Sequence, residues 1–448
     1  MTHHLILGAG PAGVIAAETI RKHAPHDRIT LVGDEPEPPY SRMAIPYLLV
    51  GNIDEHGTYL RKGGSHFADQ RIDIVNAKAT HLDATARTVT LDNGQTLSFD
   101  KLLIATGSHP VRPPIPGMDL PGIHPCWTLE NARDIAKLAQ PGARVLQMGA
   151  GFIGCIIMEA LKQRGVELTV VEMGDRMVPR MMGPAAGGMI REWCEAKGVK
   201  VYTGARVEAI EQDTPPTGLL NRLASAVGLA GSPSAAGPLK VRLSNGQTLE
   251  ADLVISATGV RPAIGFLENS GVLCLLGVLT DEHMQTNVPG IYAAGDCAEA
   301  FDKVSGKAIV SAIQPNAADQ AYVAAMNMVG KAAELKGVTQ INVLDTLGLI
   351  STSFGNWEGV PGGDKVELSD PVNHKVLSLQ FDGDVMVGCN SVGWTDHVGV
   401  MRGLVEGKVK LGEWKDHLME DPTQLMKAYL ATAQAQSHWS GAADARRR

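Results

Sequence analysis

Apolar and small residues follow one another in the same order in two stretches of the chain. In the first stretch, an apolar segment at residues 5–7 leads into a Gly-rich turn at 8–13. A helix is predicted from this turn to about His23, and a second apolar segment at 29–32 ends just before Asp34. Short apolar segments on either side of a helical spacing are typical of a strand–turn–helix–strand unit.

The second stretch repeats this order further along the chain. A strand is predicted at 145–148, a Gly-rich turn at 149–154, a helix to about Arg164, and a strand at 168–171 that ends at Glu172. The chain therefore contains two copies of one unit, and in each copy an acidic residue follows the second strand.

The rest of the chain is richer in strand patterns. Residues 88–91 and 97–99 flank an Asp-Asn-Gly-Gln turn, which predicts a β-hairpin. A helix is predicted from Gln314 to about Met328, and strand-like segments return from about residue 340. These elements predict an α/β protein with two Rossmann-like, three-layer dinucleotide-binding domains and a C-terminal α+β domain.

Two segments do not fit this plan. Residues 214–238 interrupt the second unit with prolines and glycines around a stripe of leucine and valine. We interpret this insert as a surface elaboration with a short helix, or alternatively as a docking helix for a partner protein or a membrane surface. The polar tail at 437–448 is expected to be disordered.

Composition excludes several classes of protein. The 448 residues carry a net charge of −8 and a pI near 6.0, which argues against a nucleic-acid-binding surface. No apolar run reaches about 18 residues, so no transmembrane segment is expected. The chain opens directly into an apolar strand with neither a basic region nor a cleavage site, which predicts a cytoplasmic protein.

The cysteines are scattered and form no CxxC pair. This spacing predicts neither a metal site nor an iron–sulfur cluster nor a local redox dithiol, and it fits a reducing cytoplasm. The six cysteines are Cys126, Cys155, Cys194, Cys274, Cys297 and Cys389.

The two Gly-rich turns have a chemistry of their own. Glycines let the backbone approach a pyrophosphate closely, and the start of the following helix presents free N–H groups and the positive end of its dipole. Asp34 and Glu172 are placed to accept hydrogen bonds from a ribose diol. Because a carboxylate repels a 2′-phosphate, Glu172 favours NAD(H) over NADP(H).

The ordered set of motifs resembles the FAD-dependent pyridine nucleotide–disulfide oxidoreductase superfamily. The resemblance is continuous over about residues 4–330 and weaker in the last third of the chain. It is carried by residues 8–13, Ala105-Thr106-Gly107, residues 149–154, Ala257-Thr258-Gly259, and residues 291–296.

This resemblance implies that the first unit holds FAD and the second holds the nicotinamide nucleotide. It implies an FAD-binding domain at 1–112 and 252–333, an NAD(H)-binding domain at 113–251, and a C-terminal interface domain at 334–448. The residues it implies for FAD are Gly8, Gly10, Pro11, Ala12, Gly13, Asp34, Arg42, Ala79, Thr106, Gly107, Gly295 and Asp296. Those it implies for NAD are Gly149, Gly151, Phe152, Ile153, Gly154, Glu172 and Gly259.

Within the superfamily, residues 38–42 are similar to a segment of ferredoxin reductases, rubredoxin reductases and apoptosis-inducing factor. Arg42 matches the arginine that contacts the FAD phosphates in those proteins, and a planar guanidinium suits bidentate phosphate contact.

Three positions depart from the patterns of relatives. Met43 stands where coenzyme A disulfide reductases have their reactive cysteine, and a thioether cannot form a thiolate. Ile156 stands where many relatives have a glutamate, and Gln314 where they often have a tryptophan. We list Met43, Ile156 and Gln314 as flavin neighbours and assign no catalytic side chain.

These observations predict hydride transfer between NADH and FAD, with electrons exchanged with an iron–sulfur protein or a partner subunit in either direction. One alternative is a self-sufficient NADH oxidase, or a reductase of quinones or small molecules. Another is a flavin-stabilised, redox-sensing interaction protein resembling apoptosis-inducing factor. The family resemblance is compatible with a homodimer or a hetero-oligomeric complex.

Overall fold

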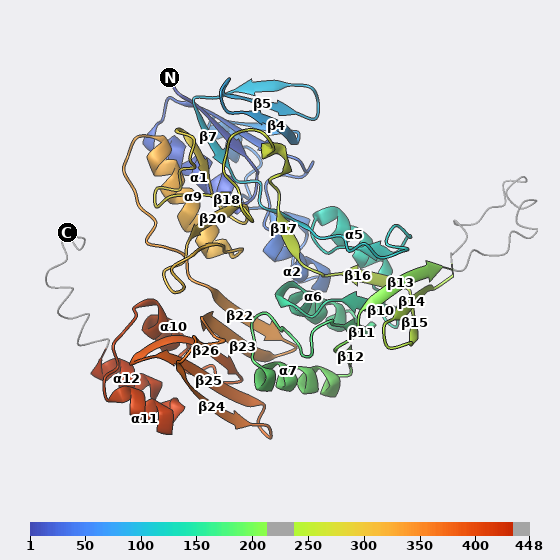
Figure 1. Ribbon diagram of the computed structural model, residues 1–448. Helices are drawn as coiled ribbons and strands as arrows, with labels where there is room; N and C mark the ends of the chain where they lie inside the picture. The colour runs from blue at the N-terminus through green and yellow to red at the C-terminus, as the bar shows by residue number, and fades with distance from the viewer. Residues whose placement is uncertain (213–236, 433–448) are drawn as a thin grey trace, which may run out of the picture.

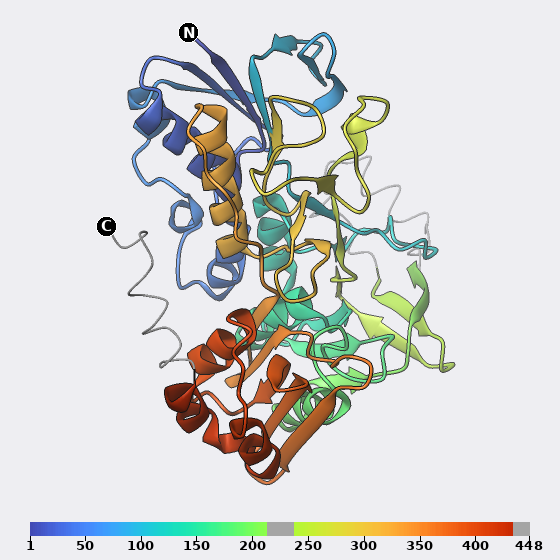
Figure 2. The same ribbon diagram turned by 60° about the vertical axis from the view of Figure 1, so that its left-hand side comes forward.

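The computed structural model describes residues 1–212 and 237–432, which form three units (Figure 1). The N-terminal unit includes the long helix labelled α9, the middle unit contains α5 to α7, and the C-terminal unit lies beside the middle one (Figures 1 and 2). Most of the insert predicted at 214–238 and the whole polar tail at 437–448 lie outside the described residues.

A five-stranded parallel sheet forms the centre of the N-terminal unit. Its strands lie in the order β19-β7-β1-β2-β3. They are β19 (Ile291–Ala293), β7 (Lys101–Ile104), β1 (His3–Leu7), β2 (Arg28–Gly33) and β3 (Ile72–Asn76). The four strands from β19 to β2 are mostly apolar and buried, as expected of a parallel sheet covered on both faces, whereas Ile72 is the one buried residue of the edge strand β3.

Two helices and a small sheet pack around this central sheet. Helices α1 (Pro11–His23) and α9 (Gln314–Met328) pack against each other, and both follow the predicted spans. The predicted hairpin is present as β5 (Thr88–Leu91) and β6 (Thr96–Ser98), which pair with β4 (Ala79–Asp83) in an antiparallel sheet. Leu82 and Val89 of this small sheet join the core of the large one.

The middle unit repeats the design with a second five-stranded sheet. Its order is β12-β11-β10-β16-β9, and every neighbouring pair is parallel. The strands are β12 (Lys200–Tyr202), β11 (Glu167–Val171), β10 (Arg144–Met148), β16 (Leu253–Ser256) and β9 (Ile123–His124).

The position of β16 corrects the domain boundary expected before residue 252. Leu253–Ser256 pairs with β10 and β9, so this strand belongs to the middle sheet. The chain returns to the N-terminal unit only after it, at β17 (Val260–Pro262), which pairs antiparallel with β8 (Ser108–Pro110). The two strands that cross between the units therefore lie side by side.

Helices and a second small sheet surround the middle sheet. The helices are α5 (Leu129–Leu138), α6 (Phe152–Gln163) and α7 (Pro184–Ala196). An antiparallel sheet is formed by β13 (Val207–Gln212), β14 (Leu239–Leu243) and β15 (Thr248–Ala251).

The C-terminal unit is an antiparallel sheet with helices on one face. Its strands are β22 (Ile341–Thr346), β23 (Leu349–Gly355), β24 (Asp364–Asp370), β25 (Lys375–Asp382) and β26 (Val385–Val392). Its helices are α10 (Val398–Glu406), α11 (Trp414–Glu420) and α12 (Leu425–Ala431). The other face packs on the middle unit, because Val376 and Val392 share a core with residues of α6 and α7.

None of the helices within the described ranges combines the length and the apolar character that crossing a bilayer requires.

Candidate active site

The first Gly-rich turn has three glycines with three different constraints. Gly8 has a φ of +113°, and a Cβ there would lie 2.0 Å from the carbonyl oxygen of Ala105. A Cβ on Gly13 would lie 1.8 Å from the carbonyl oxygen of Gly8. A Cβ on Gly10, by contrast, would have no atom within 4 Å. Two glycines therefore allow the chain to turn tightly, and the third keeps the space above the turn open.

The second turn repeats these constraints one by one. Gly149 has a φ of +95°, with Ala257 O at 2.4 Å from its hypothetical Cβ. A Cβ on Gly154 would lie 2.6 Å from the carbonyl oxygen of Gly149, as for Gly13 in the first turn. A Cβ on Gly151, like one on Gly10, would have no atom within 4 Å. This repetition supports a shared ligand chemistry for the two turns.

In each turn, a helix begins beside the open space at the middle glycine. Gly10 and Gly151 are the N-caps of α1 and α6, both are extended, and neither helix start has a side-chain cap. The uncapped N–H groups are the donors that a pyrophosphate accepts from. The residues present therefore fit one dinucleotide at each turn.

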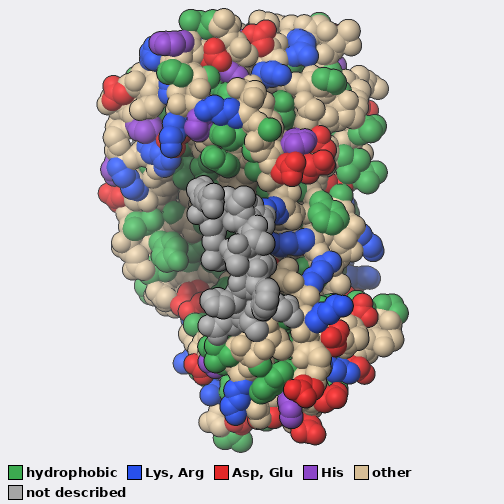
Figure 3. Space-filling model, turned by 90° about the vertical axis from the view of Figure 1, so that its left-hand side faces the viewer, with side chains coloured by type: hydrophobic (Ala, Val, Ile, Leu, Met, Phe, Trp, Pro, Cys, Tyr) green, Lys and Arg blue, Asp and Glu red, His purple; other side chains and the backbone are tan. Residues whose placement is uncertain are grey.

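A large cavity extends from the first turn to the first turn of α6. Many residues predicted for FAD line it: Gly8, Gly10, Pro11, Ala12, Asp34, Arg42, Thr106, Gly107, Gly295 and Asp296. The three predicted flavin neighbours, Met43, Ile156 and Gln314, also line it, together with Phe152 and Ile153. In Figure 3, hydrophobic side chains gather in the hollow between the upper and lower parts of the molecule.

The other predicted positions do not line this cavity. Gly13 packs beneath the turn, and Ala79 lies at the start of β4. Gly149, Gly151, Gly154, Glu172 and Gly259 belong to the second turn and its neighbouring strand ends. Their assignment to a nicotinamide nucleotide stays a prediction.

The sequence pointed to Arg42, and the structure adds the partners that orient it. Its Nη2 donates to Glu35 Oε1 at 2.6 Å, and its guanidinium lies 5.1 Å from the ring centre of Trp127. The hydroxyl of Tyr40 donates to the other Glu35 oxygen at 2.5 Å. Burial, followed by the Glu35 carboxylate, raises the pKa of Tyr40, so its hydroxyl remains a donor.

Sequence reasoning missed Glu35, Tyr40 and Trp127, all of which line the cavity. Glu35 directly follows the predicted ribose acid Asp34, and Tyr40 lies inside the motif that singled out Arg42. The only available signal was this proximity. Trp127 is far from both in the sequence, and only the fold brings it to Arg42.

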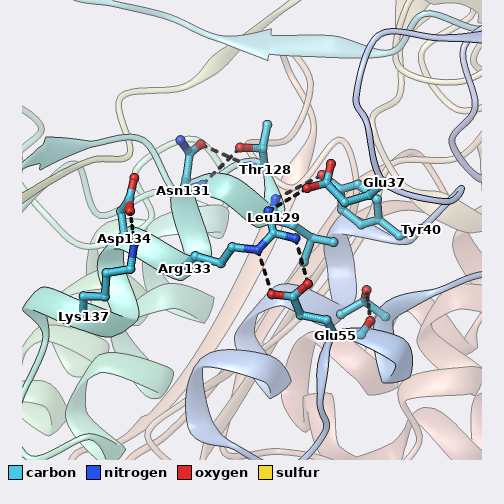
Figure 4. A network of polar contacts seen from close by, with 10 residues as sticks. Glu37, Tyr40, Glu55, Thr128, Leu129, Asn131, Arg133, Asp134 and Lys137 are labelled. Carbon is cyan, nitrogen blue, oxygen red and sulfur yellow. Dashed lines mark hydrogen bonds and ion pairs between the residues drawn. The ribbon is translucent and has the colours of Figure 1, made fainter. Parts of the chain in front are cut away.

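Figure 4 shows how the segment around Tyr40 is attached to the middle unit. Arg133 of α5 donates to both oxygens of Glu55 at 2.7 Å and to Glu37 at 2.7 Å. The hydroxyl of Tyr40 accepts from the backbone N–H of Leu129 at 3.3 Å. The segment that carries Arg42 is therefore fixed to the helix that begins at Leu129.

Asp296 also lines the cavity, and Ser108 links it to the Arg42 side, because the carbonyl of Ser108 accepts from Trp127 Nε1 at 3.1 Å. Asp296 Oδ2 accepts from Ser108 Oγ at 3.0 Å, and burial raises the pKa of its carboxyl. The neighbouring N–H of Gly295 donates to Gln320 Oε1 on α9 at 2.7 Å. Ser108 and Gln320 were not anticipated from the sequence.

The part of the cavity lined by Met43 and Ile156 is apolar. Met43 is 51% exposed, so it lies at the mouth of the cavity. Near it, Ser41 Oγ donates to Gln314 Oε1 at 3.1 Å, which links the N-terminal segment to the start of α9. Neither position offers an acid, a base or a thiol.

Cys126 is the one thiol among the lining residues, and we expect it to be chemically silent. Burial raises its pKa to about 12, so at pH 8 only about one thiol in ten thousand is ionised. With the predicted FAD bound, the Cys126→Ser variant should therefore be reduced by NADH within about twofold of the wild-type rate, measured by stopped-flow absorbance. Rapid alkylation of Cys126 at pH 8 that stops reduction would contradict this expectation.

The acid of the second unit is already engaged with the backbone. Glu172 Oε2 accepts from the N–H of Ala150, and Oε1 accepts from the N–H of Gly174, both at 2.7 Å. A carboxylate has about four lone-pair positions, so two remain for a ribose diol. Glu172 thus lies directly beside the Gly-rich turn, as its predicted role requires.

With this geometry established, comparison with known proteins assigns the class. The pyridine nucleotide–disulphide oxidoreductase family matches residues 2–326. The chain belongs to this family and is an oxidoreductase.

Several relatives are similar over most of their length. The epsilon subunit of an NADH-dependent phenylglyoxylate dehydrogenase from Aromatoleum evansii is 31% identical over 94% of this chain and 95% of that protein. An NADH oxidase from Methanocaldococcus jannaschii is 30% identical over 87% of each. The ferredoxin reductase component of a chlorobenzene dioxygenase from Cupriavidus sp. is 29% identical over 74% of this chain and 75% of the relative.

A solved structure confirms the fold class. The covalent complex of putidaredoxin reductase with putidaredoxin contains a chain that matches with a TM-score of 0.84 and 22% identity. The match covers 96% of this chain and 99% of that one. The fold of all three units is thus common to both chains.

Proposed function

We propose that this chain binds FAD at the first Gly-rich turn and NADH at the second, and exchanges electrons with an iron–sulfur protein or partner subunit. The observation that carries the proposal is the pair of open cradles, at Gly10 and Gly151, each at the uncapped start of a helix. Bound FAD supplies the hydride and electron chemistry. The chain supplies binding, orientation and exclusion of water.

Different cavity residues would contact different parts of FAD. The N–H groups at the start of α1 would hold the phosphates, and Arg42, oriented by Glu35 and Trp127, would add a charged contact. Asp296, hydrogen-bonded to Ser108, lines the same cavity. Met43, Phe152 and Ile156 give the apolar part of the cavity a surface that excludes water.

Two observations support an electron acceptor outside this chain: the cavity lining offers no reactive thiol, and two relatives work with partner proteins by their names. Among the lining residues, the one thiol has a strongly raised pKa, and Met43 cannot accept electrons. One relative is a subunit of a larger NADH-dependent enzyme and another is a ferredoxin reductase component. The cytoplasmic location and the oligomeric state stay predictions.

Anaerobic titration with NADH tests the proposal directly. The purified protein should be yellow, and one equivalent of NADH should bleach its flavin absorbance. Reoxidation by an added ferredoxin should be much faster than reoxidation by air. A colourless protein that takes up no flavin would refute the proposal.

The relative named as an NADH oxidase favours a second candidate, in which oxygen is the acceptor. This candidate predicts rapid NADH consumption in air without any partner protein. Comparing the rates of NADH consumption with oxygen alone and with a ferredoxin therefore separates the two.

We further propose that NADH is preferred over NADPH, because Glu172 faces the second turn and the nearby Arg176 is committed elsewhere. Arg176 donates to the carbonyls of Met182 and Pro179 and pairs with Asp175. The Glu172→Gln variant removes the charge, so the preference for NADH should fall by about tenfold in kcat/KM. Glu167→Gln, at the exposed start of the same strand, is the matched control. Unchanged discrimination in Glu172→Gln would contradict the assignment.

A further inference from the structure

The loop between Glu172 and α7 contains a strained residue. Val178 has a φ of +49° and is buried. A β-branched residue rarely adopts this left-handed conformation, and such strain persists only where surrounding contacts fix it. The contacts that hold Val178 in this conformation therefore indicate the role of the loop.

Val178 contacts the second Gly-rich turn through Ala150. The N–H of Val178 donates to the carbonyl of Ala150 at 2.9 Å. The N–H of Ala150 donates in turn to Glu172 Oε2 at 2.7 Å. The backbone of Ala150 is thus held at both of its polar groups: Val178 donates to its carbonyl, and Glu172 accepts from its N–H.

The far end of the loop is held by the C-terminal unit. The N–H groups of Met181 and Met182 donate to the carbonyl of Val178 at 2.9 and 3.0 Å. Asn390 of β26 donates through Nδ2 to the carbonyl of Met181, and its Oδ1 accepts from the N–H of Gly183, both at 2.8 Å. Asn390 is 2% exposed, so these bonds are shielded from water.

The neighbour of Asn390 in the sheet makes no such contact. Ser378 is the register partner of Asn390 on β25 and is also buried. Its hydroxyl accepts from Gln380 Nε2 at 3.0 Å, within the same strand. Asn390 is thus a polar side chain of this sheet that reaches across to the loop.

From this chain of contacts we propose that Asn390 is a positioning residue for the nicotinamide nucleotide. It fixes the strained turn at Val178, and through Ala150 it fixes the Gly-rich turn in the shape that receives the pyrophosphate. The inference rests on the proposed function of the second turn. It assigns the C-terminal unit a role in NADH affinity.

The test compares Asn390→Leu and Asn390→Asp with Ser378→Ala in the flavin-loaded protein. Asn390→Leu removes both hydrogen bonds at similar volume, and Asn390→Asp keeps only the acceptor for Gly183. Both should raise the KM for NADH, by about tenfold for the leucine variant, while kcat and the affinity for FAD stay near wild type. Hydrogen exchange at residues 176–183 should quicken in the same variants.

Ser378→Ala loses one buried hydrogen bond of the same sheet, so it should lower the Tm while it leaves the loop contacts intact. An Asn390→Leu variant with a lowered Tm and an unchanged KM for NADH would overturn the inference and leave the proposed function standing. Failure of the wild-type protein to be reduced by NADH would instead overturn the proposed function.

Discussion

The Gly10→Val variant is expected to be a folded but colourless protein. Gly10 has φ and ψ of −77° and −173°, a conformation that valine adopts without strain, and a side chain there would meet no protein atom. It would instead fill the space above the turn and separate the helix N–H groups from a pyrophosphate. We expect the affinity for FAD to fall by about a hundredfold or more.

Absorbance near the flavin band after purification and reconstitution measures this effect, and circular dichroism shows whether the fold is kept. A Gly10→Val protein that retains its flavin would mean that the cofactor binds elsewhere. Gly13→Val is unsuitable for this purpose, because its Cβ would collide with the carbonyl of Gly8 and disturb the turn itself.

The Gly151→Val variant should give the reciprocal result: a yellow protein that NADH does not reduce. Gly151 has φ and ψ of −76° and −172°, nearly the values of Gly10, and its Cβ would also point into open space. The substitution leaves the first turn intact. We expect the KM for NADH to rise by about a hundredfold or more, with FAD retained.

Reduction by dithionite provides the control, since it needs no nucleotide site and should proceed normally in the Gly151→Val variant. The two valine variants serve as matched controls for each other. If Gly151→Val lost FAD and Gly10→Val kept it, the assignment of the two turns would have to be exchanged.

Local patterns anticipated the units of the fold well. Helices α1 and α9 and the β5–β6 hairpin lie where periodicity and turn residues placed them, because these elements depend on neighbours within a few residues. The roles of the glycines were predictable for the same reason. The positive φ of Gly8 and the contact of Gly13 with Gly8 belong to a single turn, whereas the close approach of Gly8 to Ala105 depends on the neighbouring strand.

Pattern reasoning was less accurate where one segment could belong to either unit. The apolar run at Leu253–Ser256 has the composition of a buried strand in any sheet. Only its pairing with β10 and β9 assigns it to the middle unit. The same limit applies to Trp127, whose position over Arg42 follows from how the middle unit packs on residues 36–60.

The sequence by itself determined the two strand–turn–helix units, their acids, the absence of a thiol at position 43 and the family. Only the tertiary structure decided which side chains orient Arg42, how Arg133 joins the first two units, and that Asn390 holds the loop beside the second turn. Asn390 and Met181 are separated by 209 positions in the chain. No periodicity links such distant residues, because their contact is fixed by the packing of whole units rather than by the local backbone.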